Sequence, residues 1–243
     1  MLTVSLLGLG EAGSRLAADL AAAGADVRGY DPAVPGEPDP RAATAGADVV
    51  LSVNSAAAAL AAATAAVPAL RPGAVYADLN TAAPALKREL AALVTAAGAL
   101  FADVALLGPV PARGLRTPAL ASGDGAPAFA AALVPLGMPV EVVSAEAGDA
   151  ATMKLLRSVF MKGLAAAAME SLEGAEAAGH EKWLRGELAA VIGEPLLDRL
   201  LEGSRAHAAR RVDEMEAATE LLRGLGIEPR IAAASASLLA DLS

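Results

Sequence analysis

The residues whose types and spacing best suit chemistry are the glycines of the run Gly8-Leu9-Gly10-Glu11-Ala12-Gly13. An apolar run, Leu2–Leu7, leads into them, and an Ala/Leu-rich helical segment, Ala12–Ala23, leads out. A second short run, Asp26–Tyr30, then stops at Asp31. This order of strand, glycine turn, helix, strand and acid is the dinucleotide-binding fingerprint in the context that it requires.

Each part of the run has a physical task. Gly8 allows a tight turn, Gly10 lets the backbone approach a pyrophosphate, and Gly13 lets the helix pack closely on the strand. The start of the helix offers N–H groups and a partial positive charge to the phosphates. Glu11 either caps that helix or lies near the cofactor. Asp31 can accept hydrogen bonds from the ribose hydroxyls, so the cofactor contacts expected from position are Gly8, Leu9, Gly10, Glu11, Ala12, Gly13, Asp31, Val53 and Asn54.

A second polar pattern lies in the long helical segment after residue 148. Helical spacing puts Lys154, Ser158 and Lys162 on one stripe, with Arg157 beside it. The stripe is either a solvated face or the wall of a cleft between domains. Spacing alone favours the solvated face.

These residues depend on elements that the hydrophobic pattern predicts. Short β-like runs alternate with helical runs in the first half, which is typical of a parallel sheet. The expected strands are Leu2–Leu7, Asp26–Tyr30, Val49–Ser52, Val75–Asp78, Leu100–Val104, Ala119–Ser122 and Val140–Val143. After Ala147 only helical patterns remain. We therefore predict an α/β fold, with a Rossmann-like dinucleotide-binding domain at 1–147 and an all-helical domain for substrate binding and dimerisation at 148–243.

Composition narrows the possible partners. The chain of 243 residues carries a net charge of −9, which argues against nucleic acid and anionic membranes. It has no cysteine and two histidines in separate segments, so we expect no disulfide and no metal site. Met1 begins directly on the first expected strand, so we expect no signal peptide, and no apolar run is long enough for a membrane span. A cytoplasmic location fits these features.

Four segments carry a resemblance to a known family. They are the glycine run, Asp78-Leu79-Asn80-Thr81-Ala82-Ala83-Pro84, Asp103-Val104-Ala105-Leu106-Leu107-Gly108-Pro109-Val110, and Gly148 followed by Lys154. Their order resembles that of the β-hydroxyacid dehydrogenases, which include 3-hydroxyisobutyrate and 6-phosphogluconate dehydrogenases. The C-terminal run from Ser204 to Met215 is similar to that of a subgroup with a short helical domain of unassigned function.

The resemblance implies hydride transfer between a nicotinamide cofactor, NAD or NADP, and a small β-hydroxy acid or its semialdehyde. It implies that Lys154 transfers the proton and that Asn80 and Thr81 lie near the nicotinamide. Implied substrate contacts are Ser122, Gly123, Arg157 and Ser158. Asp31 favours NAD over NADP, because a carboxylate repels a 2′-phosphate. Members of the family pair through the helical domain, so a homodimer is expected.

Three positions depart from the family pattern: Leu107 replaces a serine, Pro109 a glycine and Ser158 an asparagine. These departures alter substrate contacts but keep the lysine and the cofactor loop. Two alternatives remain. One is an enzyme that resembles imine reductases, against which Lys154 counts, because those relatives replace the lysine. The other is a redox sensor that binds dinucleotide without turnover. Asp103 and Asp149 remain possible substitutes for Lys154 in proton transfer.

Overall fold

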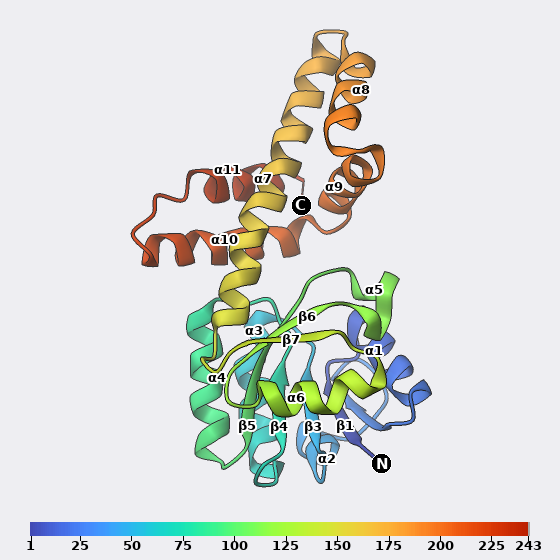
Figure 1. Cartoon of the computed structure of the whole chain (residues 1–243), viewed down its shortest axis with the longest axis vertical. Coiled ribbons are helices and arrows are strands. Elements are labelled where there is room, and N and C mark those ends of the chain that lie inside the picture. Colours follow the sequence, from blue (N-terminus) through green and yellow to red (C-terminus); the bar gives the residue numbers. More distant parts are fainter. Residues whose placement is uncertain (243) are drawn as a thin grey trace. The chain divides into compact units, whose positions relative to one another are not determined.

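The computed structural model describes residues 1–242 of the chain (Figure 1). They form two compact units, the first being Met1–Lys154 and the second beginning at Leu155. The division falls inside the long helix α7 (Asp149–Ala177). The sequence pattern instead predicts the domain boundary at 147/148, where the strands end and this helix begins.

The first unit is built on a seven-stranded sheet of order β2-β1-β3-β4-β5-β6-β7. The strands are β1 (Thr3–Leu7), β2 (Asp26–Tyr30), β3 (Val49–Ser52), β4 (Val75–Asp78), β5 (Leu100–Leu106), β6 (Ala119–Ser122) and β7 (Val140–Ser144). Alternate residues of a strand face opposite sides, so Val4 and Leu6 join one apolar core while Leu7 joins the other. The predicted strands match these elements to within two residues at each end.

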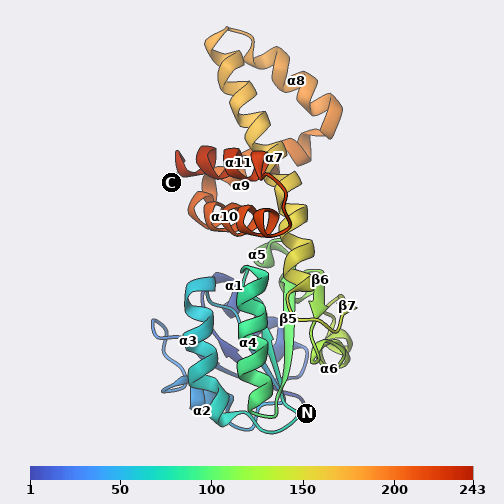
Figure 2. The same cartoon turned by 90° about the vertical axis from the view of Figure 1, so that its left-hand side faces the viewer.

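Helices cover both faces of this sheet (Figures 1 and 2). One face packs against α1 (Glu11–Ala22) and α6 (Ala126–Leu133), and the other against α2 (Pro40–Thr44), α3 (Ala56–Ala66) and α4 (Pro84–Ala96). Side-chain caps start two of them, Asp39 accepting from the N–H of Ala42 and Ser55 from that of Ala58. Short turns complete the unit: α5 (Val110–Arg113), η1 (Val67–Ala69), η2 (Gly114–Arg116) and η3 (Val134–Leu136).

The sheet differs from the sequence-based expectation at one pair of strands. All neighbouring strands are parallel except β5 and β6, which are antiparallel. The connection between them holds only α5 and η2, and neither is long enough to cross a face of the sheet and return. The expectation of a wholly parallel sheet was therefore wrong at this pair. Helix α2 and the turn α5 were not predicted either, because each is only one turn of helix.

The second unit consists of helices. From Leu155 onward it contains the rest of α7, followed by α8 (Glu181–Ile192), α9 (Glu194–Ala206), α10 (Ala208–Gly224) and α11 (Arg230–Ala240). Its apolar interior is divided into two small clusters, one around Leu155 and Met215 and one around Leu197 and Leu201. Within residues 1–242, no helix combines the length and apolar character needed to cross a bilayer.

Candidate functional site

Two of the three glycines in the turn after β1 are required by the packing of the protein itself. Gly8 has φ +112°, and a Cβ there would lie 2.3 Å from the carbonyl oxygen of Val53. A Cβ on Gly13 would lie 2.0 Å from the carbonyl oxygen of Gly8. By contrast, a Cβ on Gly10 would meet no atom of the described chain within 4 Å. Packing thus accounts for Gly8 and Gly13, whereas Gly10 borders open space that a closely approaching phosphate would occupy.

The start of α1 suits the same ligand. Gly10 is its N-cap residue and provides no side-chain cap, so the first N–H groups of the helix have no side-chain acceptor at the cap. Asp31 closes the turn: its carboxylate accepts hydrogen bonds from the N–H groups of Leu9 and Ala33, each at 2.8 Å. A carboxylate has about four acceptor positions, so Asp31 can still accept from hydroxyls. These residues fit a dinucleotide. Glu11 is exposed in the first turn of α1.

The other expected cofactor residues adjoin this turn. Val53 donates its N–H to the carbonyl of Leu7 at 2.9 Å. The N–H of Asn54 donates to Oδ1 of Asn80 at 2.8 Å, and Nδ2 of Asn80 donates back to Oδ1 of Asn54 at 3.0 Å. The structure therefore joins the segments after β1, β3 and β4, which the sequence assigned separately to one cofactor. Asn54 is exposed and Asn80 is buried.

The predicted proton-transfer residue meets the predicted nicotinamide segment. Nζ of Lys154 donates a hydrogen bond to Oγ1 of Thr81 at 2.6 Å. Lys154 lies in the second turn of α7, and Thr81 lies three residues before the first residue of α4. Both side chains are half-buried. This contact places the side-chain nitrogen of Lys154 beside the hydroxyl of Thr81, the residue next to Asn80.

A row of polar residues crosses the sheet beneath this contact. Ser52 of β3, Asp78 of β4, Asp103 of β5 and Ser122 of β6 are successive register partners, and all four are fully buried. Buried polar groups need hydrogen-bond partners. Oδ1 of Asp78 accepts from Asn80, and Oγ of Ser52 accepts from the same amide at 3.1 Å. The sequence pattern alone did not predict this row.

Lys87 of α4 supplies the positive charge for that row. Its Nζ lies 2.6 Å from Oδ2 of Asp78 and 3.1 Å from Oδ1 of Asp103, and it donates to the carbonyl of Asp78 at 2.9 Å. Burial by itself lowers the pKa of Lys87, but attraction to the two carboxylates outweighs it and holds the pKa above its usual value. Two opposite unit charges about 4 Å apart attract by about 4 kcal/mol at an effective dielectric constant near 20, so two such pairs keep the amine charged.

Two residues that were expected to contact substrate, Ser122 and Gly123, have structural roles and are buried. Oγ of Ser122 accepts from the N–H of Ala150 at 3.0 Å and donates to Asp103 at 3.3 Å, and its side chain is fully buried. Gly123 has φ +101°, and a Cβ there would lie 2.6 Å from the carbonyl oxygen of Phe101. The hydroxyl of Ser122 thus anchors the start of α7, and Gly123 is required by the turn.

Within the second unit, Ser158 belongs to a different cluster. Its hydroxyl donates to the carboxylate of Glu214 on α10, and Nζ of Lys162 lies 2.8 Å from the same carboxylate. Burial lowers the pKa of Lys162; Arg211 and Arg157 add to this, and Glu214 only partly offsets it. The stripe of Lys154, Ser158 and Lys162 is therefore not a solvated face, because Ser158 is buried and both lysines are half-buried. Arg157 is exposed.

The segment Leu107–Thr117, which includes the departures Leu107 and Pro109, is held against α1. Nη1 of Arg15 donates to the carbonyl of Pro111 at 3.1 Å, and the N–H of Leu115 donates to Oδ2 of Asp19 at 2.8 Å. The bond from Leu115, helped by Arg15, lowers the pKa of Asp19 below its usual 3.8. The helix that begins at the glycine turn therefore also holds this loop.

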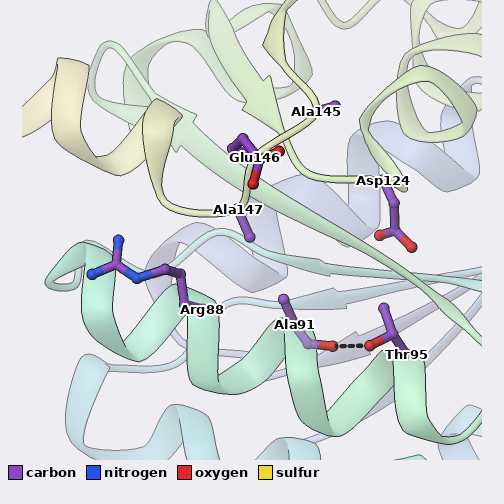
Figure 3. A pocket seen from close by; sticks show the side chains of 7 residues that line it. All are labelled: Arg88, Ala91, Thr95, Asp124, Ala145, Glu146 and Ala147. Carbon is purple, nitrogen blue, oxygen red and sulfur yellow. Dashed lines mark hydrogen bonds between the residues drawn. The ribbon is translucent and has the colours of Figure 1, made fainter.

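A separate hollow of about 330 Å³ lies beside α4 (Figure 3). Its lining residues are Arg88, Ala91, Thr95, Asp124, Ala145, Glu146 and Ala147. The side chain of Thr95 donates to the carbonyl of Ala91 rather than toward the hollow (Figure 3). None of the predicted cofactor or substrate residues lines it.

The model for the NAD-binding domain of 6-phosphogluconate dehydrogenase matches residues 3–126. The chain belongs to this family. A second model, a domain of unknown function named DUF1932, matches residues 175–242. The first match thus covers strands β1 to β6 of the first unit, and the second match falls in the helical region, as the resemblance implied.

Several solved structures share the fold of this chain. A conserved hypothetical protein from Sinorhizobium meliloti is 30% identical, covers 99% of this chain and 88% of its own, and has a TM-score of 0.78. Mycobacterium tuberculosis 3-hydroxyisobutyrate dehydrogenase, solved with L-serine, shares the fold at 22% identity, 99% and 93% coverage and a TM-score of 0.81. An Aspergillus terreus reductive aminase, solved with NADPH and ethyl levulinate, shares it at 19% identity, 99% and 93% coverage and a TM-score of 0.65.

A curated relative matches over a shorter span. An uncharacterized 28.5 kDa protein of Methanothermus fervidus is 28% identical over 144 residues, which is 58% of this chain. The match spans 55% of the length of that relative.

Several residues of this family member were missed as site residues by the sequence analysis. They are Asp78, Lys87, Arg15, Asp19 and Glu214. A signal existed for the first two: Asp78 ends an apolar strand, and Lys87 is one of only four lysines in the chain. Glu214 falls in the C-terminal run that resembles the subgroup, but no local pattern links it to its partners Ser158 and Lys162, which are distant in sequence.

Proposed function

We propose that the protein is an NAD(P)-dependent oxidoreductase that transfers a hydride to or from a small β-hydroxy acid or its semialdehyde, with Lys154 as the proton-transfer group. The observation that supports this most directly is the 2.6 Å hydrogen bond between Lys154 and Thr81. It joins the residue proposed for proton transfer to the segment proposed to hold the nicotinamide. Lys154 and Asn80–Thr81 otherwise lie far apart in the sequence.

The residues divide the work of the reaction. Gly10 and the start of α1 would hold the pyrophosphate, Asp31 the ribose, and Asn54, Asn80 and Thr81 the nicotinamide end. The bound nicotinamide supplies the acceptor or donor of the hydride. Lys154 takes the hydroxyl proton of the substrate during oxidation and returns it during reduction. Thr81 orients the lysine amine, since its hydroxyl accepts a hydrogen bond from Nζ of Lys154 and leaves the nitrogen lone pair of the neutral amine available for the substrate proton.

Substrate recognition is assigned to the helix that carries the lysine. Arg157 is exposed and follows Lys154 by three residues on α7, so both project from neighbouring parts of the helix. We propose that its guanidinium binds the substrate carboxylate through paired hydrogen bonds. Ser158 lies one turn after Lys154 and contacts Glu214. We therefore propose that Ser158 supports this region of the helix and does not bind the substrate carboxylate.

Replacing Lys154 tests the proposal. Lys154→Ala should reduce kcat by about 10²- to 10⁴-fold with little change in NADH affinity, because general acid–base catalysis contributes about that much. The measurement is turnover across a panel of small hydroxy acids and aldehyde acids with NAD and NADP. Lys182→Ala, at an exposed lysine on α8, is the matched control. Unchanged turnover in Lys154→Ala would transfer the role to the exposed Asp149, because Asp103 is fully buried against Lys87 and cannot reach a substrate.

The same panel separates the competing functions. A redox sensor would bind NADH but oxidise none of it with any substrate. An enzyme that resembles imine reductases would turn over imines and would not depend on Lys154. The fold that the chain shares with a reductive aminase makes cyclic imines a useful addition to the panel.

We also propose that NAD(H) is preferred over NADP(H). The carboxylate of Asp31 would lie near the 2′ position of the ribose, where a phosphate would be repelled. Arg28 does not offset this, since its guanidinium donates to the carbonyl of Ala45 and lies 3.5 Å from Asp26. NADH should therefore bind more tightly than NADPH in a fluorescence titration, and Asp31→Ser should narrow the difference. Tighter binding of NADPH by the parent protein would contradict the preference.

The lack of cysteine fits the cytoplasm, which is where we propose that the protein works. We further propose that it is a homodimer.

A further inference from the structure

The buried row of the sheet contains two carboxylates in direct opposition. Asp78 and Asp103 are register partners on adjacent parallel strands, and both side chains are fully buried. Like charges directly opposite each other on neighbouring strands destabilise a sheet. A buried charge without a partner is also strongly unfavourable. This arrangement therefore requires a cation.

Lys87 is that cation, and it is unusual in the chain. Among residues 1–242, it is the only buried lysine or arginine. Its Nζ contacts Asp78 twice, at the carboxylate and at the carbonyl, and lies 3.1 Å from Asp103. The three groups together carry one net negative charge inside the protein. None of them is exposed, so Lys87 does not touch a ligand.

Each carboxylate of this triad holds a different segment of the proposed site. Asp78 accepts from Nδ2 of Asn80, the residue that precedes Thr81. Asp103 accepts from the N–H of Ala151 at 2.9 Å, in the first turn of α7. The positive end of the α7 dipole points at this carboxylate, which strengthens the bond. Asp78 thus fixes the position of Thr81, and Asp103 fixes the start of the helix that carries Lys154.

The starts of α4 and α7 are also packed together. Gly148 has φ +102°, and a Cβ there would lie 3.0 Å from the carbonyl oxygen of Pro84, the first residue of α4. Lys87 follows Pro84 within the first turn of that helix. The connections from Lys87 therefore reach both partners of the 2.6 Å contact between Lys154 and Thr81.

We propose that Lys87 is a positioning residue, which holds the Asn80–Thr81 segment and the first turn of α7 in register so that Lys154 meets Thr81. The inference rests on the proposed function, because it concerns the geometry of the same proton-transfer pair. Its role goes beyond neutralising charge: Lys87 contacts both Asp78 and Asp103, so losing it separates two segments that it connects.

The test removes the connection but keeps the charge. Lys87→Met leaves two buried carboxylates without a cation and can fail to fold, so the informative variant is Lys87→Met/Asp78→Asn. It has the same net charge as the parent, and the amide oxygen introduced at position 78 can still accept from Asn80. Lys182→Met on the exposed surface of α8 is the matched control.

Two measurements on the double variant decide the question. We expect kcat to fall by about tenfold to a hundredfold, the effect of a displacement of about 1 Å, with NADH affinity near the parent value. We also expect amide hydrogen exchange at Ala150 and Ala151 to quicken by about tenfold while exchange in β1 and β3 stays unchanged. Exchange needs no substrate, so it still reports on positioning if no turnover is found and the proposed function fails.

Two results would overturn the inference. Unchanged exchange at the start of α7 would show that Lys87 does not position that helix. Faster exchange spread evenly over β1, β3 and α7 would show that Lys87 only stabilises the sheet.

Discussion

At the scale of single residues, the glycines of the first turn differ in what requires them. Gly8 and Gly13 are required by the protein, since a Cβ on either would approach a backbone carbonyl oxygen to 2.3 Å or less. Gly10 has no such neighbour and does not have a positive φ. A side chain at Gly10 should therefore leave the fold intact and obstruct only a ligand that approaches the backbone.

Gly10→Val provides the corresponding test. The valine should weaken NADH binding by at least about a hundredfold, because its side chain fills the space of the pyrophosphate, while the thermal midpoint stays near that of the parent. Isothermal titration and thermal unfolding measure the two effects. Gly174→Ala in α7 is the matched control, since a Cβ there also meets no atom within 4 Å. A folded Gly10→Val protein with normal NADH affinity would contradict the assignment of the turn.

At the scale of elements, the hydrophobic pattern of the sequence predicts where strands and helices lie. Strands such as Val49–Ser52 and Val75–Asp78 were located to the residue, because short apolar runs bounded by turns are distinctive. The antiparallel β6 was placed correctly but its direction was not, since no local pattern encodes direction. The contact between Lys154 and Thr81 depends on two elements that meet only in the fold, so the sequence could suggest the residues but not their distance.

The buried row illustrates the same limit. Ser52, Asp78 and Asp103 each look like an isolated polar residue at or near the end of an apolar run. Only the register shows that they are neighbours, and only then does Lys87 on α4 become their counter-ion. The polar residues inside apolar strands are therefore the signal in the sequence from which this row could have been inferred.

The hydrogen bonds that hold the segment Leu107–Thr117 against α1 lead to a prediction with a defined pH window. The pKa of Asp19 is lowered by the Leu115 N–H and by Arg15, so its bonds stabilise the folded state when the carboxylate is charged. This stabilisation is complete above the usual pKa of 3.8 and is lost as the pH falls through the lower pKa of the folded state. Asp19→Asn should thus be less stable than the parent at neutral pH, and the difference should shrink in acid.

Chemical unfolding of both proteins at a series of pH values measures that difference. Amide exchange at Leu115 should also quicken in Asp19→Asn at neutral pH. Asp213→Asn, which changes an exposed carboxylate on α10, should show neither effect. A stability difference that stays constant as the pH falls well below the usual pKa of 3.8 would argue against a stabilising role for the charged Asp19 carboxylate.

At the scale of the whole molecule, the two units are unequal in their interiors. The first has two large apolar clusters, one on each face of a seven-stranded sheet. The second has two small clusters, and α8 contributes no buried residue to either. A small helical unit buries a smaller fraction of its surface on folding than a larger domain does, so it draws less stability from its apolar interior. The family match to the first unit accounts for the cofactor site, but it does not explain how the second unit is stabilised with so small an apolar interior.

This small apolar interior leads to the last prediction, that the protein is a homodimer joined through its helical unit. Large apolar side chains there are exposed: Phe160 by 68%, Trp183 by 66% and Val191 by 81%. Full burial of a fully exposed side chain of this kind contributes about 1.5–3 kcal/mol, and covering the exposed parts of these three favours association with a second copy. Light scattering at micromolar concentration should give twice the mass of the chain. Val191→Glu should shift that mass toward the monomer and lower the thermal midpoint of the helical unit, whereas Val134→Glu, the same change at an exposed valine of the first unit, should do neither. A monomeric mass for the parent protein would remove the dimer, and a dimer unaffected by Val191→Glu would move the interface away from α8.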